Sequence, residues 1–468
     1  MPPILALGLF VAGAVWLFAM EKKWRWEVSG ALWIPLLWLI IIGSRPISSW
    51  FGLGGPTGVD YLEGSPFDRM FFLSLIVMGG LVLMTRRVNW PETFARNKWI
   101  FIYFLYLGIS TMWSEEPFVA FKRWVKDVGN VVLVLVVLTE KNPINAAKAL
   151  MVRCSYLLIP GSVLVIKYYP ALGRYYDRWT YKPFFGGVAT DKNLLGITLF
   201  VCGLTLFWIL FDLRNGKSQG KDKIEKLTLV GLIAMTLWLL RKANSSTALA
   251  CTIVGASILI AMRYPTIRAK AQRMGVYGAA GVIILLFFEM TFGLSEIVIK
   301  LLGRDVTLTG RTDIWSAVLT EKINPLLGAG FYSFWLGDRP ERLSDKLYYH
   351  LNQAHSGYLE TYLNSGWIGV LLLAAVLVSA ARRIQDRVAV GSNVDGLRLA
   401  FLISSAVYNF TEAAFDRLNM LWFFLLLVIF EAGRPRKVGG RVPKPRETAL
   451  APDERERQSL TNMRAVPA

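Results

Sequence analysis

Uninterrupted apolar runs of about 15 to 20 residues recur along most of this chain, and they constrain its fold more than any other feature. A run of this length can cross the hydrocarbon core of a bilayer as a helix. The composition agrees, since 54% of the 468 residues are hydrophobic and only 18% are charged, which excludes a disordered or fibrous protein. We therefore expect lipid to be the solvent of most of the chain.

The runs predict an all-α, polytopic integral membrane protein of about 12–13 transmembrane helices, formed by residues 1–433. We expect the first run to be an uncleaved span, because Met1-Pro2-Pro3 supplies no basic segment ahead of it. Residues 434–468 are rich in Pro, Arg and Glu, and they predict a disordered, basic cytoplasmic tail. The candidate spans are 3–20, 28–43, 68–84, 98–112, 125–138, 149–169, 193–213, 227–240, 247–262, 275–293, 366–381, 397–411 and 417–432.

The net charge of +19 indicates topology before it indicates partners, because Lys and Arg are retained on the cytoplasmic side of a membrane. Assigning alternate connections to opposite sides places 32 of the 52 basic residues in one set, mostly in short loops and in the tail. That set predicts the cytoplasmic side and a cytoplasmic C-terminus; with thirteen spans the N-terminus lies outside. The other side carries 20 basic residues and one long extracytoplasmic loop, at about 294–365.

The long loop is expected to carry short helices. Apolar residues at helical spacing over 294–302 predict a helix on the membrane interface, and a second helix is predicted from about 312 to 323. Gly328-Ala329-Gly330 follows as a loop signal, too short to indicate a phosphate cradle. The spans themselves hold few charges. Lys126 and Asp127 are placed at the start of the fifth span, where local pairing or snorkelling explains them.

Both histidines of the chain, His350 and His355, lie in this loop. Either could be an ordinary polar residue, but a neutral imidazole can also accept a proton from a hydroxyl nucleophile. Arg311 in the same loop, with Arg241 and Lys242 in another outer connection, remains outside against the retention bias. Such residues serve solubility or contact lipid headgroups, or together they bind an anionic, phosphate-bearing substrate.

Several motifs in a fixed order resemble the bacterial O-antigen ligase and O-antigen polymerase superfamily, and most of all its exopolysaccharide-production branch. The resemblance covers roughly residues 68–432. The motifs are Trp113-Ser114 with Pro117 and Arg123; Thr190-Asp191-Lys192-Asn193-Leu194-Leu195-Gly196; Gly310-Arg311 with Trp315 and Pro325 ahead of Gly328-Ala329-Gly330; His355-Ser356-Gly357-Tyr358-Leu359-Glu360; and Gly366-Trp367-Ile368-Gly369.

The resemblance implies an inverting, metal-independent glycosyl transfer at the periplasmic face of the bacterial inner membrane, with no cofactor. It implies a donor glycan on undecaprenyl diphosphate and an acceptor hydroxyl on lipid A-core or on another lipid-linked glycan. The family's loop histidine matches His355 and its Gly-Arg arginine matches Arg311. The family's Ser-Arg-Thr-like sequence reads Asn244-Ser245-Ser246-Thr247 here, so Arg241 or Lys242 must substitute for that arginine.

The predicted site therefore has His355 and Arg311 as catalytic residues. The predicted substrate-binding residues are Arg241, Lys242, Lys192, Arg304, His350 and Glu360. A diphosphate is a good leaving group that needs charge stabilisation more than protonation, which suits arginine. A transporter or flippase for a lipid-linked sugar is the alternative; it predicts charged residues in the middle of spans or internal symmetry.

Overall fold

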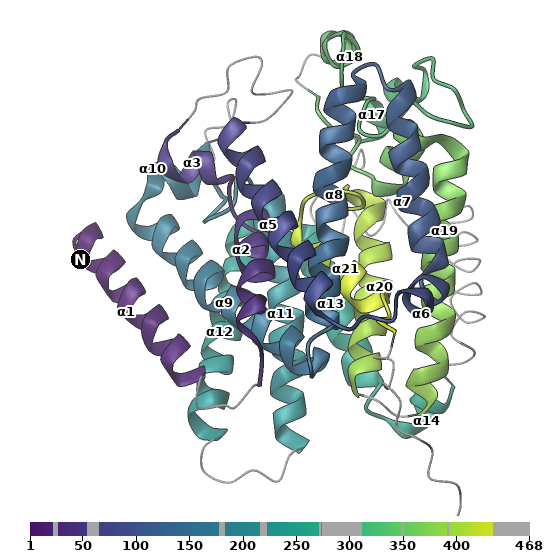
Figure 1. The fold of residues 1–468 in the computed structure, drawn as a ribbon. Helices are drawn as coiled ribbons and strands as arrows, with labels where there is room; N and C mark the ends of the chain where they lie inside the picture. The colour runs from purple at the N-terminus through teal and green to yellow at the C-terminus, as the bar shows by residue number, and fades with distance from the viewer. Residues whose placement is uncertain are drawn as a thin grey trace, which may run out of the picture. The chain divides into compact units, whose positions relative to one another are not determined.

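The computed structural model describes residues 1–21, 27–53, 65–176, 183–215, 222–270, 273, 311–347, 351–390 and 393–433 (Figure 1). In chain order the helices are α1 (Pro3–Glu21), α2 (Trp33–Ile42), α3 (Ile47–Phe51), α5 (Pro66–Thr85), α6 (Trp90–Arg96), α7 (Lys98–Ser110), α8 (Pro117–Leu138), α9 (Pro143–Tyr168), α10 (Pro170–Gly173), α11 (Lys192–Asn215), α12 (Asp222–Ala243), α13 (Ser246–Ala261), α14 (Pro265–Ala269), α17 (Arg311–Leu319), α18 (Arg339–Leu347), α19 (Gly357–Val390), α20 (Asn393–Thr411) and α21 (Met420–Ile429), with 3-10 turns at Gly30–Leu32 and Thr111–Trp113.

The prediction of an all-α, polytopic membrane protein is confirmed. Within the described ranges, α1, α5, α9, α11 and α19 are long and apolar enough to cross a membrane, and shorter apolar helices accompany them. Each candidate span overlaps a helix except 275–293, which lies outside the described residues. The predicted interfacial helix at 294–302 and the tail at 434–468 also lie outside them.

The starts of several helices follow from their capping residues. The Asn142 side chain accepts a hydrogen bond from the Asn145 N–H at 3.1 Å, and Pro143 occupies the first turn of α9. Asn419 caps α21 in the same way, accepting from the Trp422 N–H at 2.9 Å. A polar cap satisfies backbone donors that would otherwise be exposed to lipid, so these helices begin at defined residues.

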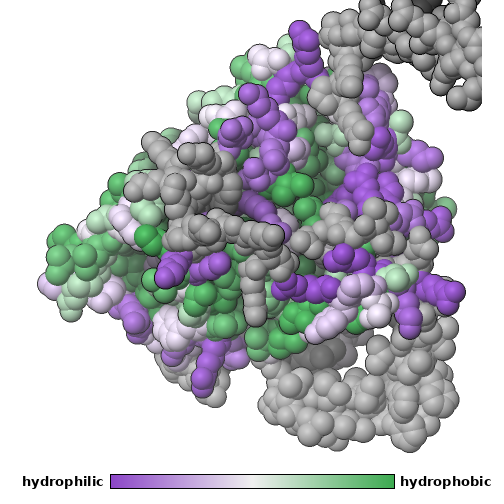
Figure 2. All heavy atoms as spheres, turned by 90° about the horizontal axis from the view of Figure 1, so that it is seen from below, coloured by the Kyte–Doolittle hydropathy of each residue, from purple (hydrophilic) through white to green (hydrophobic). Residues whose placement is uncertain are grey.

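The central helices pack in a continuous series. α11 packs against α9, α12 and α13, and α13 packs against α20. α20 also contacts α19 and α21, while α21 contacts α8, and α8 contacts α5. α1 packs against α9 and leaves apolar side chains such as Ile4 and Val15 exposed, as a lipid-facing helix does. Seen from the end that carries α14, Figure 2 shows hydrophobic residues on the projecting edge and hydrophilic ones gathered elsewhere on that face.

Three local predictions need correction. The loop helix α17 ends at Leu319, ahead of the predicted end near residue 323, and α18 was not predicted. A small antiparallel hairpin of β1 (Arg174–Tyr176) and β2 (Pro183–Phe185), with Tyr175 opposite Phe184, was also not predicted. The buried Arg45 braces this hairpin by donating to the Tyr175 hydroxyl at 2.9 Å and to the Ala189 carbonyl at 3.0 Å.

The largest correction concerns the fifth span. α8 begins at Pro117 and not near residue 125, so Asp127 lies in the middle of this helix. Its side chain is buried and accepts hydrogen bonds from Trp422 of α21 at 2.8 Å and from Asn130 at 3.0 Å. Local pairing at the start of a span therefore does not describe Asp127, which faces a neighbouring helix inside the bundle.

Candidate active site

One buried carboxylate joins the two residues that the sequence singles out for catalysis. Glu412 follows the end of α20, and its Oε1 atom accepts from Arg311 Nη2 at 2.6 Å. Its Oε2 atom lies 3.3 Å from Nδ1 of His355. Arg311 is the first residue of α17 and His355 lies two residues before α19, so the site assembles from three distant segments.

The backbone around His355 is held in an unusual conformation. His355 has a φ of 51°, in the left-handed region that residues other than glycine rarely adopt. The carbonyl of Ala354 accepts from Trp315 Nε1 of α17 at 2.8 Å, and the Gly357 N–H donates to the Glu412 carbonyl at 3.1 Å. These bonds tie the histidine loop both to the helix of Arg311 and to the residue that joins them.

Glu360 is the second buried carboxylate at this loop. It accepts from the Ala354 N–H at 2.6 Å and from Trp335 Nε1 at 3.0 Å, and it pairs with Arg417 at 3.4 Å. Its carboxylate thus bonds donors from three segments of the protein. This geometry favours a positioning role for Glu360 over the direct substrate contact that we predicted.

The glycine motifs of the sequence pair with one another. Gly366 interrupts α19 with φ 60° and ψ −166°, and a Cβ at this position would lie 2.2 Å from the Leu326 carbonyl oxygen. The Ala329 N–H donates to Leu363 O at 2.9 Å, and the Gly330 N–H donates to Asn364 O at 2.8 Å. These amides are therefore used within the protein to dock the loop onto the break in α19.

Two predicted cationic residues flank the β2 strand. Lys192 Nζ lies 4.6 Å from the Phe184 ring centroid, and Lys242 Nζ lies 5.5 Å from that of Phe185. Arg241, which precedes Lys242 at the end of α12, is exposed. Arg304 and His350, the other predicted substrate-binding residues, lie outside the described residues.

Close helix packing connects this cationic region with Glu412. A Cβ at Gly196 of α11 would lie 3.0 Å from the Ser245 side chain, so α11 and the start of α13 are in close contact. The hydroxyl groups of Thr247 and Thr411 are 2.9 Å apart, which joins the start of α13 to the residue before Glu412. The stretch Ser245-Ser246-Thr247 therefore borders the candidate site without supplying a cation.

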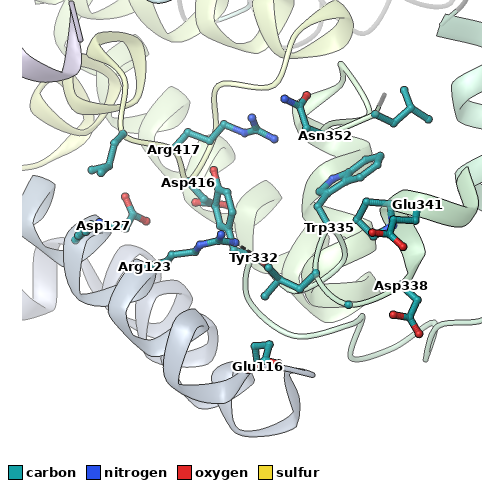
Figure 3. Close-up of a pocket in the computed structure, with 16 residues that line it drawn as sticks. Glu116, Arg123, Asp127, Tyr332, Trp335, Asp338, Glu341, Asn352, Asp416 and Arg417 are labelled. Atoms are coloured by element: carbon teal, nitrogen blue, oxygen red, sulfur yellow. Dashed lines mark hydrogen bonds between the residues drawn. The ribbon is translucent and has the colours of Figure 1, made fainter. Parts of the chain in front are cut away.

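A cavity of about 860 Å³ adjoins the histidine loop at Leu351 and Asn352 (Figure 3). Arg417 connects the two, because it lines the cavity, donates to Gln353 Oε1 at 2.9 Å and pairs with Glu360. Arg311, His355 and Glu412 do not line it. The charged and aromatic lining residues are Glu116, Arg123, Lys126, Asp127, Tyr332, Trp335, Asp338, Glu341, Asp416 and Arg417.

The chemistry of the cavity wall is shaped by burial. Burial raises the pKa of the Asp416 carboxyl well above its usual range, and the nearby Asp127 charge raises it further. Burial also raises the pKa of the Tyr332 phenol, so its hydroxyl stays protonated. In the part of the chain that the structure describes, no group of three or more His, Cys, Asp or Glu residues is placed to hold a metal ion.

Sequence reasoning missed Glu412, Asp416 and Arg417. The sequence does contain a signal for them, because these three charged residues lie in one short connection between two apolar helices, where uncharged residues would suffice. The three cysteines, Cys154, Cys202 and Cys251, are free and lie buried within helices.

Comparisons with known proteins agree with the motifs. Residues 227–374 match the family model described as O-Antigen ligase, a segment that includes Arg311, His355 and Glu360. The chain is also 25% identical over 334 residues to the exopolysaccharide production protein ExoQ of Rhizobium meliloti (strain 1021), covering 66% of this chain and 70% of that protein. The resemblance is thereby confirmed: the chain is a multi-pass membrane protein that is similar to the O-antigen ligase family over residues 227–374 and to an exopolysaccharide production protein over 66% of its length.

Proposed function

We propose that this protein is an inner-membrane glycan transferase that moves a saccharide from undecaprenyl diphosphate onto a hydroxyl acceptor, in the polymerisation or ligation of a surface polysaccharide. The transfer is inverting and needs no metal ion, and the site faces the periplasm, with the C-terminus in the cytoplasm. The family match and the similarity to an exopolysaccharide production protein support the reaction class. The acceptor is another lipid-linked glycan or lipid A-core.

The observation that carries the proposal is the shared carboxylate of Glu412. When Nδ1–H of His355 donates to Glu412, the Nε2 atom is left unprotonated and can accept the proton of the acceptor hydroxyl. The acceptor oxygen then bonds to the anomeric carbon as the bond from that carbon to the diphosphate oxygen breaks. The diphosphate leaves with the electron pair, and the proton remains on the imidazole.

Arg311 stabilises the leaving diphosphate in this proposal. A guanidinium has five N–H donors in a planar fork, and the bond to Glu412 fixes its orientation with one of them. Preorganised positive charge stabilises the developing charge of a phosphate leaving group without protonation. Lys192, Lys242 and Arg241, around β2 and the end of α12, supply positive charge for the phosphate-bearing part of the substrate.

The experiment replaces the chromosomal gene with the His355→Gln or Arg311→Gln variant. Both are expected to abolish the surface polysaccharide and to accumulate undecaprenyl-diphosphate-linked repeat units while the variant protein reaches the membrane. The matched control is Arg342→Gln on α18, because Arg342 is 59% exposed and pairs with Glu321 away from the site. Polysaccharide of normal amount and length in the His355→Gln strain would overturn the assignment.

A flippase for a lipid-linked sugar is the second candidate, and Asp127 favours it. That hypothesis predicts charged residues within spans, and Asp127 is buried in the middle of α8. Proteoliposomes that contain only this protein and a fluorescent lipid-linked sugar separate the two candidates. Movement of the lipid between leaflets without a new glycosidic bond would support the flippase, and formation of that bond supports the transferase.

A further inference from the structure

The wall of the 860 Å³ cavity contains two buried carboxylate oxygens that lack a hydrogen-bond partner among the described residues. They are Oδ2 of Asp127 and Oδ1 of Asp416, and both residues line the cavity. Asp127 is 2% exposed and Asp416 8% exposed. Leaving a buried acceptor unsatisfied is costly, so each such group in a folded protein calls for a physical explanation.

The other oxygen of each carboxylate is held in place. Asp127 Oδ1 accepts from Trp422 Nε1 at 2.8 Å and from Asn130 Nδ2 at 3.0 Å. Asp416 Oδ2 accepts from the hydroxyl of Tyr103. Each side chain is thus oriented by protein donors, and its remaining oxygen is buried without a donor among the described residues. Figure 3 shows Asp127 and Asp416 on neighbouring walls of the same cavity.

The backbone at the cavity is also strained. Tyr332 and Asp416 adopt φ angles of 53° and 55°, in the left-handed region. Residues other than glycine remain in this region only where the surroundings impose it, and such residues cluster at ligand-binding sites. The Tyr332 carbonyl accepts from Arg123 Nη1 at 3.0 Å, which is one of the contacts that hold this loop.

The charge of the lining determines which ligand fits. Five acidic side chains face three basic ones, Arg123, Lys126 and Arg417, so the cavity has no excess of positive charge and does not favour a diphosphate. A neutral sugar fits better, because its hydroxyl groups donate to carboxylates and accept from cations, and its C–H faces pack on aromatic rings such as Tyr332 and Trp335. The volume lies within the range of about 300 to 1,000 Å³ that is usual for small-ligand sites.

We propose that this cavity is a saccharide subsite in which Asp127 and Asp416 accept hydrogen bonds from sugar hydroxyl groups. The inference rests on the proposed function, and it assigns to the cavity the uncharged part of a glycan, while the diphosphate binds near Arg311. The glycan belongs either to the acceptor or to the donor, since both present the same hydroxyl chemistry.

The test measures binding of oligosaccharide fragments, prepared by partial hydrolysis of the polysaccharide that the source cell makes, to the purified full-length protein in nanodiscs. The variants are Asp127→Asn and Asp416→Asn, which keep one oxygen for the existing bonds and replace the unsatisfied acceptor by a donor. The matched control is Asp345→Asn, because Asp345 is exposed on α18 and does not line the cavity.

Each variant is expected to raise the dissociation constant about tenfold, because the new amide NH₂ donates where the sugar hydroxyl requires an acceptor, while the control binds as the wild type does. Equal binding by the wild type and by both variants, when both variants are folded at the temperature of the assay, would overturn the subsite. Inorganic diphosphate serves as a second probe; its competition with the fragment would also contradict the assignment of the cavity to the uncharged part.

Binding in the His355→Gln background separates this inference from the proposed function, because fragment binding requires no turnover. If that variant still makes polymer, the proposed chemistry fails while the binding result stands. In the transfer assay, Asp127→Asn is expected to raise KM for one substrate only. A higher KM for the acceptor assigns the subsite to the acceptor glycan, and a higher KM for the lipid-linked donor assigns it to the donor glycan.

Discussion

Replacing Glu412 by glutamine tests the arrangement of the site most specifically. The carbonyl oxygen of glutamine can still accept from Arg311, which lies 2.6 Å from Oε1, so the guanidinium keeps a partner. The amide nitrogen would then face Nδ1 of His355, which lies 3.3 Å from Oε2. Because an amide NH₂ donates, Nδ1 becomes the acceptor and the proton moves to Nε2, where it blocks removal of the acceptor proton.

The magnitude follows from this change of tautomer. General base catalysis contributes about 10²- to 10⁴-fold, so we expect kcat of the Glu412→Gln variant to fall by about that factor. KM for the acceptor should change little, because no substrate contact is removed. Glutamine is preferred to alanine, since removing one partner of a buried ion pair destabilises a protein by about 3–5 kcal/mol.

The assay is glycan transfer by the purified protein, with lipid-linked donor and acceptor, over a range of pH. Glu321→Gln is the matched control, because Glu321 pairs with the exposed Arg342 on the neighbouring helix. A Glu412→Gln enzyme with kcat within threefold of the wild type would refute the positioning role of Glu412. An equal loss in the control would show that the assay responds to stability alone.

Three further predictions concern stability. Gly366→Ala should destabilise the protein by about 3 kcal/mol, because φ is 60° and the new Cβ would lie 2.2 Å from Leu326 O. Gly80→Ala, with open space around the new Cβ, should not destabilise it. Thermal unfolding in detergent compares the two variants, and equal midpoints would contradict the strain at Gly366. Asp416→Asn should raise the melting temperature at pH 7, because burial and the Asp127 charge raise the Asp416 pKa in the folded state. Because the pKa of this carboxyl is raised, the stability of the wild type falls as the pH rises above about 4. The higher melting temperature of the variant should therefore disappear at lower pH. A gain in melting temperature that does not depend on pH would be inconsistent with this cause. Glu140→Gln should lower the melting temperature at pH 7, because hydrogen bonds from Ser29 and Arg86 outweigh the burial of Glu140 and lower its pKa. The stability that this adds is present above about pH 4 and is lost in more acidic solution. Melting curves from pH 7 downward compare the variant with the wild type, and the gap between their melting temperatures should shrink only below about pH 4.

The transmembrane organisation could be predicted because lipid imposes long apolar helices, and the runs of the sequence show them directly. The start of α8 could not, since Lys122, Arg123, Lys126 and Asp127 interrupt its apolar pattern over two turns. The burial of Asp127 depends on partners such as Trp422, which lies 295 positions away along the chain. Periodicity contains no information about such contacts.

The candidate site, too, could be predicted from the sequence only in part. His355 and Arg311 were predicted from composition, side of the membrane and motif resemblance, and the structure brings both to Glu412. The residue between them was missed because it lies 57 positions from His355 and 101 positions from Arg311. Glu360 was predicted near the substrate because of its motif. Its bonds to Ala354 and Trp335 could be seen only in three dimensions.

Glycan transfer by this protein is tested most directly by glycosidic bond formation in proteoliposomes that contain the purified protein, undecaprenyl-diphosphate-linked repeat units and no other protein. We expect the wild type to extend the glycan and to release one free undecaprenyl diphosphate for each new bond, whereas His355→Gln should do neither at a measurable rate. Extension at the wild-type rate by His355→Gln, or release of undecaprenyl diphosphate without a new bond, would contradict this expectation.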